Sequence, residues 1–385
     1  MGIDCGHGAA GERRRRPRAA RQPHLLALRR SGRLRGHGPC DPHRRPRPAA
    51  LRRPPFSAAP ERVRPMRTDA AAGHRGYLHD AVYYDSDDDL LAVTVPFLLG
   101  GVKAGQPTVV SLGARNSALL RGALPAGCGV IFLAGGDLYA RPTAAIRSYR
   151  EMLAGYVADG ARQIRIVGEL PSSALGVTWD WWARYESAIN HAYDDFPLWS
   201  LCAYDTRSTP APVLRDVART HPRHATPDGG RMPSPGYTDP FTYLRENRPA
   251  PPDPLQSTPP VVELFMPTAA QARAAVYAAD GGRLPADDVE DLVVAVSETV
   301  TNAMRHGRPP VCLRLWVGTD RMVATVSDGG DGPKDPFTGL LPVGDGTDGG
   351  LGLWITYQSC NHVTAHRGPG GYTLRLTAGN PHFTA

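Results

Sequence analysis

Apolar and polar positions divide the chain after residue 76 into short apolar runs and longer segments with apolar residues at helical spacing. Short apolar runs bounded by turn residues are typical of buried strands, and helical spacing is typical of amphipathic helices. Their alternation predicts an α/β domain with a largely parallel sheet. The predicted strands are 81–85, 107–113, 129–135, 163–170 and 198–205, and the predicted helices are 87–101, 116–124, 143–159, 179–193 and 213–220.

The pattern changes after residue 260, where alternating strands follow two helical segments. Within 311–317, Val311, Leu313, Leu315 and Val317 alternate with other residues, which is the period of a half-buried strand. We therefore predict an α+β sandwich whose mixed sheet is covered by helices on one face. Its predicted strands are 263–267, 311–317, 321–328, 362–367 and 372–377, and its predicted helices are 269–279, 287–306 and 351–359.

The segment between these two patterns is rich in Pro, Gly, Asp, Ser and Thr. This composition predicts a semi-extended linker, with one short docked turn of helix within 237–246. The expected organisation is a first domain at 77–222, a linker at 223–259 and a second domain at 260–379.

The first 65 residues carry the positive charge of the chain. They hold 17 arginines and four acidic residues, which give a net charge of +13. Because the whole chain has a net charge of +7, the remaining residues carry −6. A basic arm that binds nucleic acid or an anionic membrane is one interpretation, and a folded segment is another. The stretch lacks interleaved aromatic residues and apolar periodicity, so we favour translated upstream sequence with Met66 as the initiator. Residues 1–70 are predicted to be disordered, and direct nucleic-acid binding is not expected.

Cysteine spacing and hydropathy bear on the compartment. The six cysteines lie far apart without a CxxC pair, which argues against a zinc site and a disulfide framework and favours a reducing cytoplasm. No run of eighteen apolar residues occurs, so neither a membrane span nor a membrane partner is expected. The N-terminus also lacks the apolar core of a secretory signal. We expect a cytoplasmic protein.

The predicted helix 287–306 displays a carboxylate and an amide together. Glu298, Asn302 and His306 are spaced four residues apart and therefore share one face. An amide oxygen is a hard ligand for Mg²⁺, and a carboxylate can orient or deprotonate an attacking hydroxyl. A solvated polar face is the alternative, because Glu186 and Asn190 repeat the spacing with no phosphate-binding loop after them. The opposite face is predicted to be apolar through Val293, Val296, Val300 and Ala303.

Two glycine-rich segments follow this helix. In 327–332, Asp328 at a strand end can accept a hydrogen bond from an exocyclic amine such as that of adenine, while Gly330 and Gly332 let a base and ribose approach the backbone. In 348–355, Gly350 and Gly352 lie where a loop enters a helix, whose free N–H groups suit a triphosphate. Each segment alone is equally compatible with a glycine-rich turn. Their occurrence in this order favours a nucleotide site.

The three segments together resemble the N, G1 and G2 boxes of the GHKL ATPase and kinase superfamily, and "SETVTNAMRHG" is similar to the anti-sigma-factor serine/threonine kinases. The resemblance implies binding of ATP and Mg²⁺, with Glu298 as the catalytic base, Asn302 as the Mg²⁺ ligand and Asp328 as the adenine acceptor. It implies further ATP contacts from His306, Gly330, Gly332, Gly350, Leu351, Gly352, Leu353 and Thr373. The loop 333–348 holds one cationic residue, Lys334, where more are expected near a γ-phosphate.

The resemblance implies a signalling regulator that phosphorylates a serine or threonine of a partner protein. The implied partner is a STAS-type anti-anti-sigma protein, a sigma factor or both. The alternative is a binding module in which ATP organises a partner surface without phosphoryl transfer. The resembled kinases often form homodimers, although no residue here requires one. A histidine kinase is not expected, because the proline-rich linker cannot form its phosphoacceptor hairpin.

The first domain resembles the methanogen/methylotroph sensory (MEDS) domain, in segments such as "HDAVYYDSDDDL", "WARYESAINHAY" and "CAYDTR". The family is a signal-input module, which implies an unidentified small-molecule or protein input. No Walker A motif occurs, since "GGVKAG" lacks the GK[ST] ending, and phosphate binding there is not expected.

A sensory pocket is predicted in this first domain, because open α/β sheets bind ligands at their strand ends. Its candidate residues are Glu169, Glu186, Asn190, Tyr204 and Asp205. The alternative is that Glu186 and Asp205 form pairs with Arg184, Arg207 or the backbone. Three tryptophans, Trp179, Trp181 and Trp182, are interpreted as core residues. His191 and His221 are interpreted as surface or capping residues and not as metal ligands.

Overall fold

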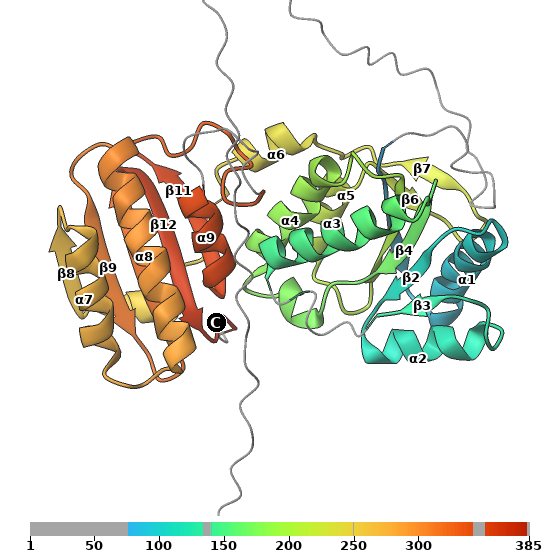
Figure 1. The fold of residues 1–385 in the computed structure, drawn as a ribbon, viewed down its shortest axis with the longest axis horizontal. Coiled ribbons are helices and arrows are strands. Elements are labelled where there is room, and N and C mark those ends of the chain that lie inside the picture. The colour runs from blue at the N-terminus through green and yellow to red at the C-terminus, as the bar shows by residue number, and fades with distance from the viewer. Residues whose placement is uncertain (1–75, 134–138, 140, 249, 342–350, 383–385) are drawn as a thin grey trace, which may run out of the picture. The chain divides into compact units, whose positions relative to one another are not determined.

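The computed structural model describes residues 76–133, 139, 141–248, 250–341 and 351–382, which form the two domains drawn in Figure 1. The disorder predicted for residues 1–70 lies outside the described residues. Within the described ranges, none of the helices combines the length and the hydropathy needed to cross a bilayer.

A seven-stranded sheet in the order β3-β2-β4-β5-β1-β6-β7 forms the centre of the N-terminal domain. Every neighbouring pair from β3 to β6 is parallel, and only β7 runs antiparallel to its neighbour β6. The predicted α/β domain is therefore confirmed. The strands are β1 (Leu78–Tyr84), β2 (Thr108–Ser111), β3 (Ile131–Phe132), β4 (Ile164–Gly168), β5 (Leu198–Asp205), β6 (Arg223–Ala225) and β7 (Arg231–Pro233).

Helices cover both faces of this sheet, α1 and α2 on one side and α3, α4 and α5 on the other (Figure 1). Successive residues of a strand point to opposite faces. On β1, Val82 packs with the α1 side while Ala81 packs with the opposite side, so His79 shares the face of Ala81. The helices are α1 (Asp87–Lys103), α2 (Ala114–Ala123), α3 (Pro142–Ala158), α4 (Trp179–Ala192) and α5 (Ala211–Thr220), with a 3₁₀ turn η1 (Ser172–Leu175) before α4.

The structure differs from the predicted linker in its first part, which joins the N-terminal sheet as β6 and β7. On β7, the Arg231 guanidinium donates to both oxygens of the Asp80 carboxylate on β1, at 2.6 and 2.8 Å. The Trp199 indole also donates to Asp80, at 2.8 Å. All three side chains are buried. A bidentate buried ion pair of this kind fixes the position of a strand that has little apolar sequence of its own.

The next part of the predicted linker also belongs to the N-terminal domain. The helix α6 (Pro240–Arg245) lies within the predicted helical turn, begins at the N-cap Asp239 and buries Tyr243 completely. Arg248 forms an ion pair with Asp216 of α5, and Arg219 of α5 forms one with Glu246. These contacts extend the N-terminal domain to Arg248.

The C-terminal domain contains a five-stranded sheet in the order β11-β12-β10-β9-β8. All four neighbouring pairs are antiparallel. The prediction of a mixed sheet is therefore wrong, because β11 runs parallel to β10 but lies on the far side of β12, where the two do not pair. The strands are β8 (Val262–Phe265), β9 (Cys312–Val317), β10 (Arg321–Asp328), β11 (His362–Gly368) and β12 (Gly371–Gly379).

Three helices cover one face of this sheet, α7 (Ala269–Asp280), α8 (Ala286–His306) and α9 (Leu351–Ser359) (Figure 1). The predicted apolar face of α8 is confirmed, since Val293, Val296, Val300 and Ala303 are all buried. At the other end of the layer, α7 begins with a capping box between Thr268 and Gln271. The predicted sandwich with helices on one face is confirmed.

The opposite face of the sheet is crossed by residues 251–258, which include the 3₁₀ turn η2 (Pro254–Ser257). The Asp253 carboxylate accepts two hydrogen bonds from Arg321, each 2.9 Å long. Arg375 donates to the Pro251 carbonyl at 2.6 Å, and the Trp316 indole donates to the Thr258 carbonyl at 2.8 Å. The last part of the predicted linker therefore packs on the C-terminal domain.

Candidate functional site

A pocket of the C-terminal domain lies between α8 and the adjoining ends of β10 and β12. Of the residues predicted from the sequence motifs, five line it together: Asn302, His306, Asp328, Gly332 and Leu353. They come from α8, the end of β10, the loop after it and α9. The structure thus brings residues from all three glycine- or amide-bearing segments to one cavity.

The first turn of α9 lies directly against the polar face of α8. A Cβ atom added at Gly352 would overlap Glu298 Oε2 and lie 3.3 Å from Asn302 Nδ2. A side chain at residue 352 would therefore displace the Glu298 carboxylate. Glu298 and Asn302 are both half-buried. The free N–H groups of a helix N-terminus favour negative charge, and here they lie beside the amide of Asn302.

Asp328 ends β10 with its side chain 7% exposed. Its Oδ1 accepts hydrogen bonds from the backbone N–H groups of Gly330, at 2.6 Å, and Arg308, at 3.2 Å. A Cβ atom added at Gly307 would lie 2.5 Å from Asp328 Oδ1. Backbone donors on Oδ1 therefore fix the orientation of the carboxylate, and its Oδ2 accepts no hydrogen bond from the described residues.

One wall of the pocket is aromatic. Gly332 has φ +71°, and a Cβ added there would lie 2.5 Å from the ring of Tyr372. Glycine is required because both the left-handed backbone and the close ring exclude a side chain. Burial raises the pKa of Tyr372 above its usual value, so the phenol stays neutral. A flat apolar wall beside a fixed carboxylate suits a planar base that carries an amino group.

Of the other predicted site residues that the structure describes, Glu298, Gly330, Leu351, Gly352 and Thr373 do not line this cavity. Gly350 lies outside the described residues. The side chain of Leu351 is 60% exposed. Thr373 pairs with Ser327 of β10, and strand alternation puts it on the face of Arg375, away from the neighbouring Tyr372 and Leu374 that line the pocket. The loop lysine, Lys334, does line it.

Sequence reasoning missed several lining residues, namely Thr299, Ala303, Val326, Thr338, Tyr372 and Leu374. Thr299 and Ala303 could have been found, because they lie three or four residues from Asn302 and His306 on one helix. Val326 precedes Asp328 by two residues and so shares its face of β10. Tyr372 and Thr338 could not, since their proximity depends on how the loop after β10 returns to the sheet.

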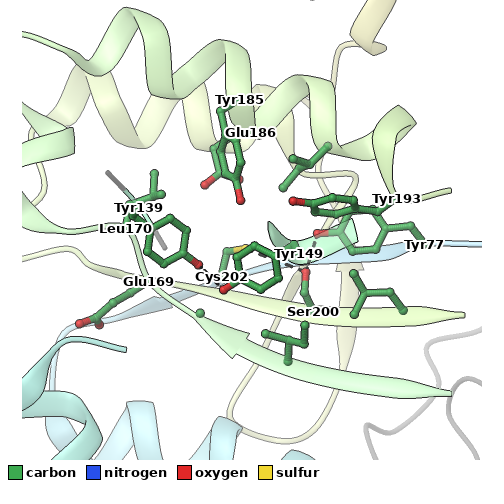
Figure 2. A pocket seen from close by; sticks show the side chains of 14 residues that line it. Tyr77, Tyr139, Tyr149, Glu169, Leu170, Tyr185, Glu186, Tyr193, Ser200 and Cys202 are labelled. Carbon is green, nitrogen blue, oxygen red and sulfur yellow. Dashed lines mark hydrogen bonds between the residues drawn. The ribbon is translucent and has the colours of Figure 1, made fainter. Parts of the chain in front are cut away.

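The predicted sensory pocket is divided by the structure. Glu169 and Glu186 both line a tyrosine-rich cavity between α4 and the sheet (Figure 2). Asn190, Tyr204 and Asp205 do not line it, but Glu169, Tyr204 and Asp205 together line a second cavity at the carboxyl ends of the parallel strands. Glu169 accepts hydrogen bonds from the Gly113 N–H, at 2.7 Å, and from the Asn116 amide, at 2.6 Å, at the carboxyl end of the strands.

Asp205 follows the structural alternative. The Arg207 guanidinium donates to its two oxygens at 2.8 and 2.6 Å, and this contact lowers the pKa of Asp205. Glu186, in contrast, forms no pair with Arg184 and instead accepts a hydrogen bond from the Tyr204 hydroxyl at 3.0 Å.

The histidine and tryptophan interpretations have mixed outcomes. His191 is exposed, as predicted, and the three tryptophans are buried, as predicted. His221 is the C-cap of α5, which is the capping role predicted for it, and it is completely buried rather than at the surface. It is enclosed by His79 of β1, Glu186 of α4 and Tyr204 of β5. The described cysteines, Cys128, Cys202, Cys312 and Cys360, are free thiols.

Comparison with known proteins gives matches for both domains. Residues 78–222 match the MEDS family (methanogen/methylotroph, DcmR sensory domain), and residues 266–378 match the histidine kinase-like ATPase domain. Serine-protein kinase RsbW of Bacillus velezensis is 33% identical over 104 residues, which are 24% of this chain and 64% of that protein. RsbW of Staphylococcus epidermidis is 29% identical over 139 residues, which are 30% of this chain and 85% of that protein.

The chain thus spans 64% of the length of the Bacillus velezensis relative. A solved structure of the RsbU and RsbW domains of a Mycobacterium tuberculosis protein matches at 22% identity, with a TM-score of 0.23, over 33% of this chain and 35% of that one. Residues 78–222 belong to the MEDS sensory-domain family, and residues 266–378 belong to the histidine kinase-like ATPase family.

Proposed function

We propose that this chain is a cytoplasmic, ATP-dependent serine/threonine protein kinase of the anti-sigma type, adjusted by its sensory domain. The observation that carries the proposal is one pocket that holds the oriented Asp328 carboxylate, the Asn302 amide and a glycine-relieved aromatic wall. The relatives named serine-protein kinase RsbW support the reaction class.

The residues present fit a magnesium nucleotide. Asp328 offers an acceptor held in place by backbone donors, as recognition of an adenine amino group requires. The Tyr372 ring and the apolar residues Val326 and Leu374 would flank the base. Asn302 would provide an amide oxygen for Mg²⁺, and Lys334 on the loop would provide a cation for the phosphates. Mg²⁺ would neutralise charge on the phosphate oxygens.

Phosphoryl transfer would need little covalent chemistry from the protein. The hydroxyl oxygen of a partner serine or threonine forms a bond to the γ-phosphorus, the bond to the β,γ-bridging oxygen breaks, and ADP leaves. Glu298 would accept the hydroxyl proton, and its position beside Gly352 and Asn302 supports that role. The first turn of α9 would stabilise negative charge through its free N–H groups. Positioning and charge stabilisation supply most of the rate in this reaction class.

The proposed partner is a STAS-type anti-anti-sigma protein that carries the acceptor serine or threonine, a sigma factor, or both. The relatives' printed name supports a protein substrate with a serine acceptor. The sensory domain would supply the input, and the whole chain could act as a homodimer.

The full-length chain, γ-labelled ATP and candidate STAS proteins test the kinase proposal. We expect label on a serine or threonine of one partner. Glu298→Gln should lower the rate of labelling by about 10²–10⁴-fold, the usual contribution of a general base, while ATP affinity measured by calorimetry changes little. The matched control is Glu290→Gln, an exposed glutamate of the same helix, which should change neither quantity.

Two other results have a clear meaning. Tight ATP binding without transfer to any partner, with unchanged partner capture by Glu298→Gln, would replace the kinase by the binding-module alternative. Absence of magnesium-dependent ATP binding by the folded full-length chain would overturn both.

A further inference from the structure

Four side chains with metal-ligating atoms converge inside the sensory domain. They are His79 of β1, Glu186 of α4, Cys202 of β5 and His221 after α5, and their ligand atoms all lie within 4.8 Å of one another. His79 and Glu186 are each 2% exposed, and His221 is fully buried. The four residues come from separate elements that the parallel sheet brings together.

A hydrogen-bond network fixes the tautomer of His79. Its Nδ1 lies 3.1 Å from Asn190 Oδ1. The Asn190 amide nitrogen donates to three carbonyls, including that of Thr220 at 2.8 Å, which identifies Oδ1 as the acceptor. The proton of His79 is therefore on Nδ1, and its Nε2 carries a lone pair.

The same arrangement recurs at His221. Its Nδ1 lies 2.9 Å from the Val217 carbonyl, so this nitrogen is also the protonated one. Each histidine thus directs an unprotonated Nε2 toward Glu186, and His221 Nε2 has no hydrogen-bond partner.

Glu186 completes a cluster of electron-rich atoms. Its Oε1 accepts from Tyr204, but its buried Oε2 has no hydrogen-bond partner. Oε2 lies 3.4 Å from His79 Nε2 and 3.5 Å from His221 Nε2. His79 Nε2 has the Cys202 thiol as a hydrogen-bond partner, but Glu186 Oε2 and His221 Nε2 face each other without a donor, which is unfavourable in a buried site. A cation at their centre removes this cost.

Three of the six distances between the ligand atoms fit a single ion, and all six are within 4.8 Å. Zinc bonds of about 2.0–2.1 Å to nitrogen and oxygen and about 2.3 Å to sulfur give tetrahedral edges of about 3.4 Å between N and O and about 3.6 Å between N and S. The two Glu186 edges match the first value, and Cys202 Sγ lies 3.3 Å from His79 Nε2, near the second. We propose that His79, Glu186, Cys202 and His221 bind one divalent transition-metal ion, with zinc as the principal occupant.

The surroundings have the form of a metal site's outer shell. Metal-bound histidines typically donate their other ring N–H to a carbonyl or carboxylate, and both histidines here donate to oxygen acceptors. A nitrogen, oxygen and thiolate donor set favours zinc over calcium or magnesium. Figure 2 shows Glu186 and Cys202 on opposite sides of the tyrosine-lined cavity.

The competing occupant of the cluster is a proton. Burial raises the pKa of Glu186, and a protonated Glu186 could donate from Oε2 to one of the two Nε2 atoms. A proton leaves the thiol of Cys202 neutral, whereas a metal ion requires its thiolate. The state of Cys202 therefore separates the two occupants.

The test uses the full-length chain. Its zinc content is measured first, and its absorption spectrum is then recorded with cobalt in place of zinc. We expect about one equivalent of zinc per chain after gel filtration, measured by mass spectrometry of the element. Cobalt exchange should give thiolate-to-cobalt charge-transfer absorption and the intense d–d bands of a tetrahedral site. Cys202→Ser should remove the charge-transfer band, and Glu186→Gln and His221→Gln should lower zinc affinity.

Matched controls are available within the chain. Cys128→Ser, Glu151→Gln and His191→Gln replace the same residue types outside the cluster and should retain the metal content and spectrum. Asn190→Leu removes the acceptor that orients His79 without removing a ligand, and it should lower zinc affinity by about 10–100-fold.

Circular dichroism checks that each variant is folded. If Cys202→Ser does not fold, the wild-type cobalt spectrum alone decides. A folded wild-type chain that takes up neither zinc nor cobalt overturns the proposal, as does a cobalt spectrum without thiolate absorption. Either result assigns the cluster to a proton.

Discussion

The pocket of the C-terminal domain and the buried cluster of the N-terminal domain hold polar groups in opposite ways. In the ATPase domain, Asp328 is bound by backbone N–H groups on one oxygen and leaves the other available to a ligand. In the sensory domain, Glu186 and two histidines direct acceptor atoms at one another in a buried cluster. The first arrangement suits a ligand that binds and leaves, and the second suits an ion that stays. Under the proposed function, the open site would serve ATP turnover and the buried cluster would serve sensing.

In the N-terminal domain, the largest loss of stability is expected for Arg231→Met. Arg231→Met leaves the Asp80 carboxylate buried without its partner, and breaking a buried pair costs about 3–5 kcal/mol. Urea unfolding followed by tryptophan fluorescence would measure the loss, since Trp199 shares the same carboxylate. Arg115→Met, which removes an exposed pair with Asp87, should cost about 1 kcal/mol or less. Equal losses for the two variants would contradict this account of the sheet.

In the C-terminal pocket, the largest loss of ATP affinity is expected for Asp328→Asn. The variant keeps an oxygen for the backbone donors but loses the charged acceptor, so ATP affinity should fall by about 10–100-fold, corresponding to about 1.5–3 kcal/mol. Titration calorimetry on the full-length chain measures the change. Asp331→Asn, at an exposed aspartate of the same loop, is the control and should leave affinity unchanged. If Asp328→Asn binds ATP with unaltered affinity, Asp328 is not the acceptor for the adenine amino group.

Gly352→Ala tests whether the close contact between α8 and α9 is needed for ATP affinity. Its methyl group would overlap the Glu298 carboxylate, and we expect about a tenfold loss of ATP affinity, or about 1.4 kcal/mol. Gly155→Ala adds a methyl group to a helix at a site with open space, and it should stabilise the fold slightly without affecting ATP. A Gly352→Ala chain with normal affinity would show that α9 can shift away from α8.

The smallest effect is expected at the half-exposed pair of Asp205 and Arg207. Arg207 lowers the folded-state pKa of Asp205, so the pair stabilises the fold above the unfolded carboxyl pKa of about 3.9 and loses that contribution as pH falls through the lower folded value. Arg207→Gln should therefore cost at most about 1 kcal/mol at pH 7 and still less near pH 3. Thermal unfolding at the two pH values measures it. A loss of stability in Arg207→Gln that is larger near pH 3 than at pH 7 would contradict this account of the pair.

The pocket of the C-terminal domain could be predicted in part because several of its residues follow the periodicity of a single element. Glu298, Asn302 and His306 follow helical spacing, and Asp328 ends a recognisable strand. Thr373 was predicted to contact the nucleotide, whereas the pocket wall uses its neighbour Tyr372, because one residue of strand register exchanges the two faces.

The buried cluster could not be predicted in the same way. His79, Glu186, Cys202 and His221 belong to separate elements, and only the strand order brings β1 and β5 together beneath α4. The lone histidine after α5 has no local signal that distinguishes a cap from a ligand. The strands β6 and β7 were missed for a similar reason, since the Asp80–Arg231 pair holds them and their composition is that of a linker.

The segment 251–258 that crosses the ATPase sheet sets where this domain can be excised. A fragment that begins at residue 260 would remove the Asp253 carboxylate from Arg321 and the Pro251 carbonyl from Arg375, exposing the flank of Trp316 as well. A fragment beginning at residue 250 retains all of these contacts. Genetic fusions or assays of an isolated domain that omits residues 251–258 would therefore measure a sheet that lacks these contacts.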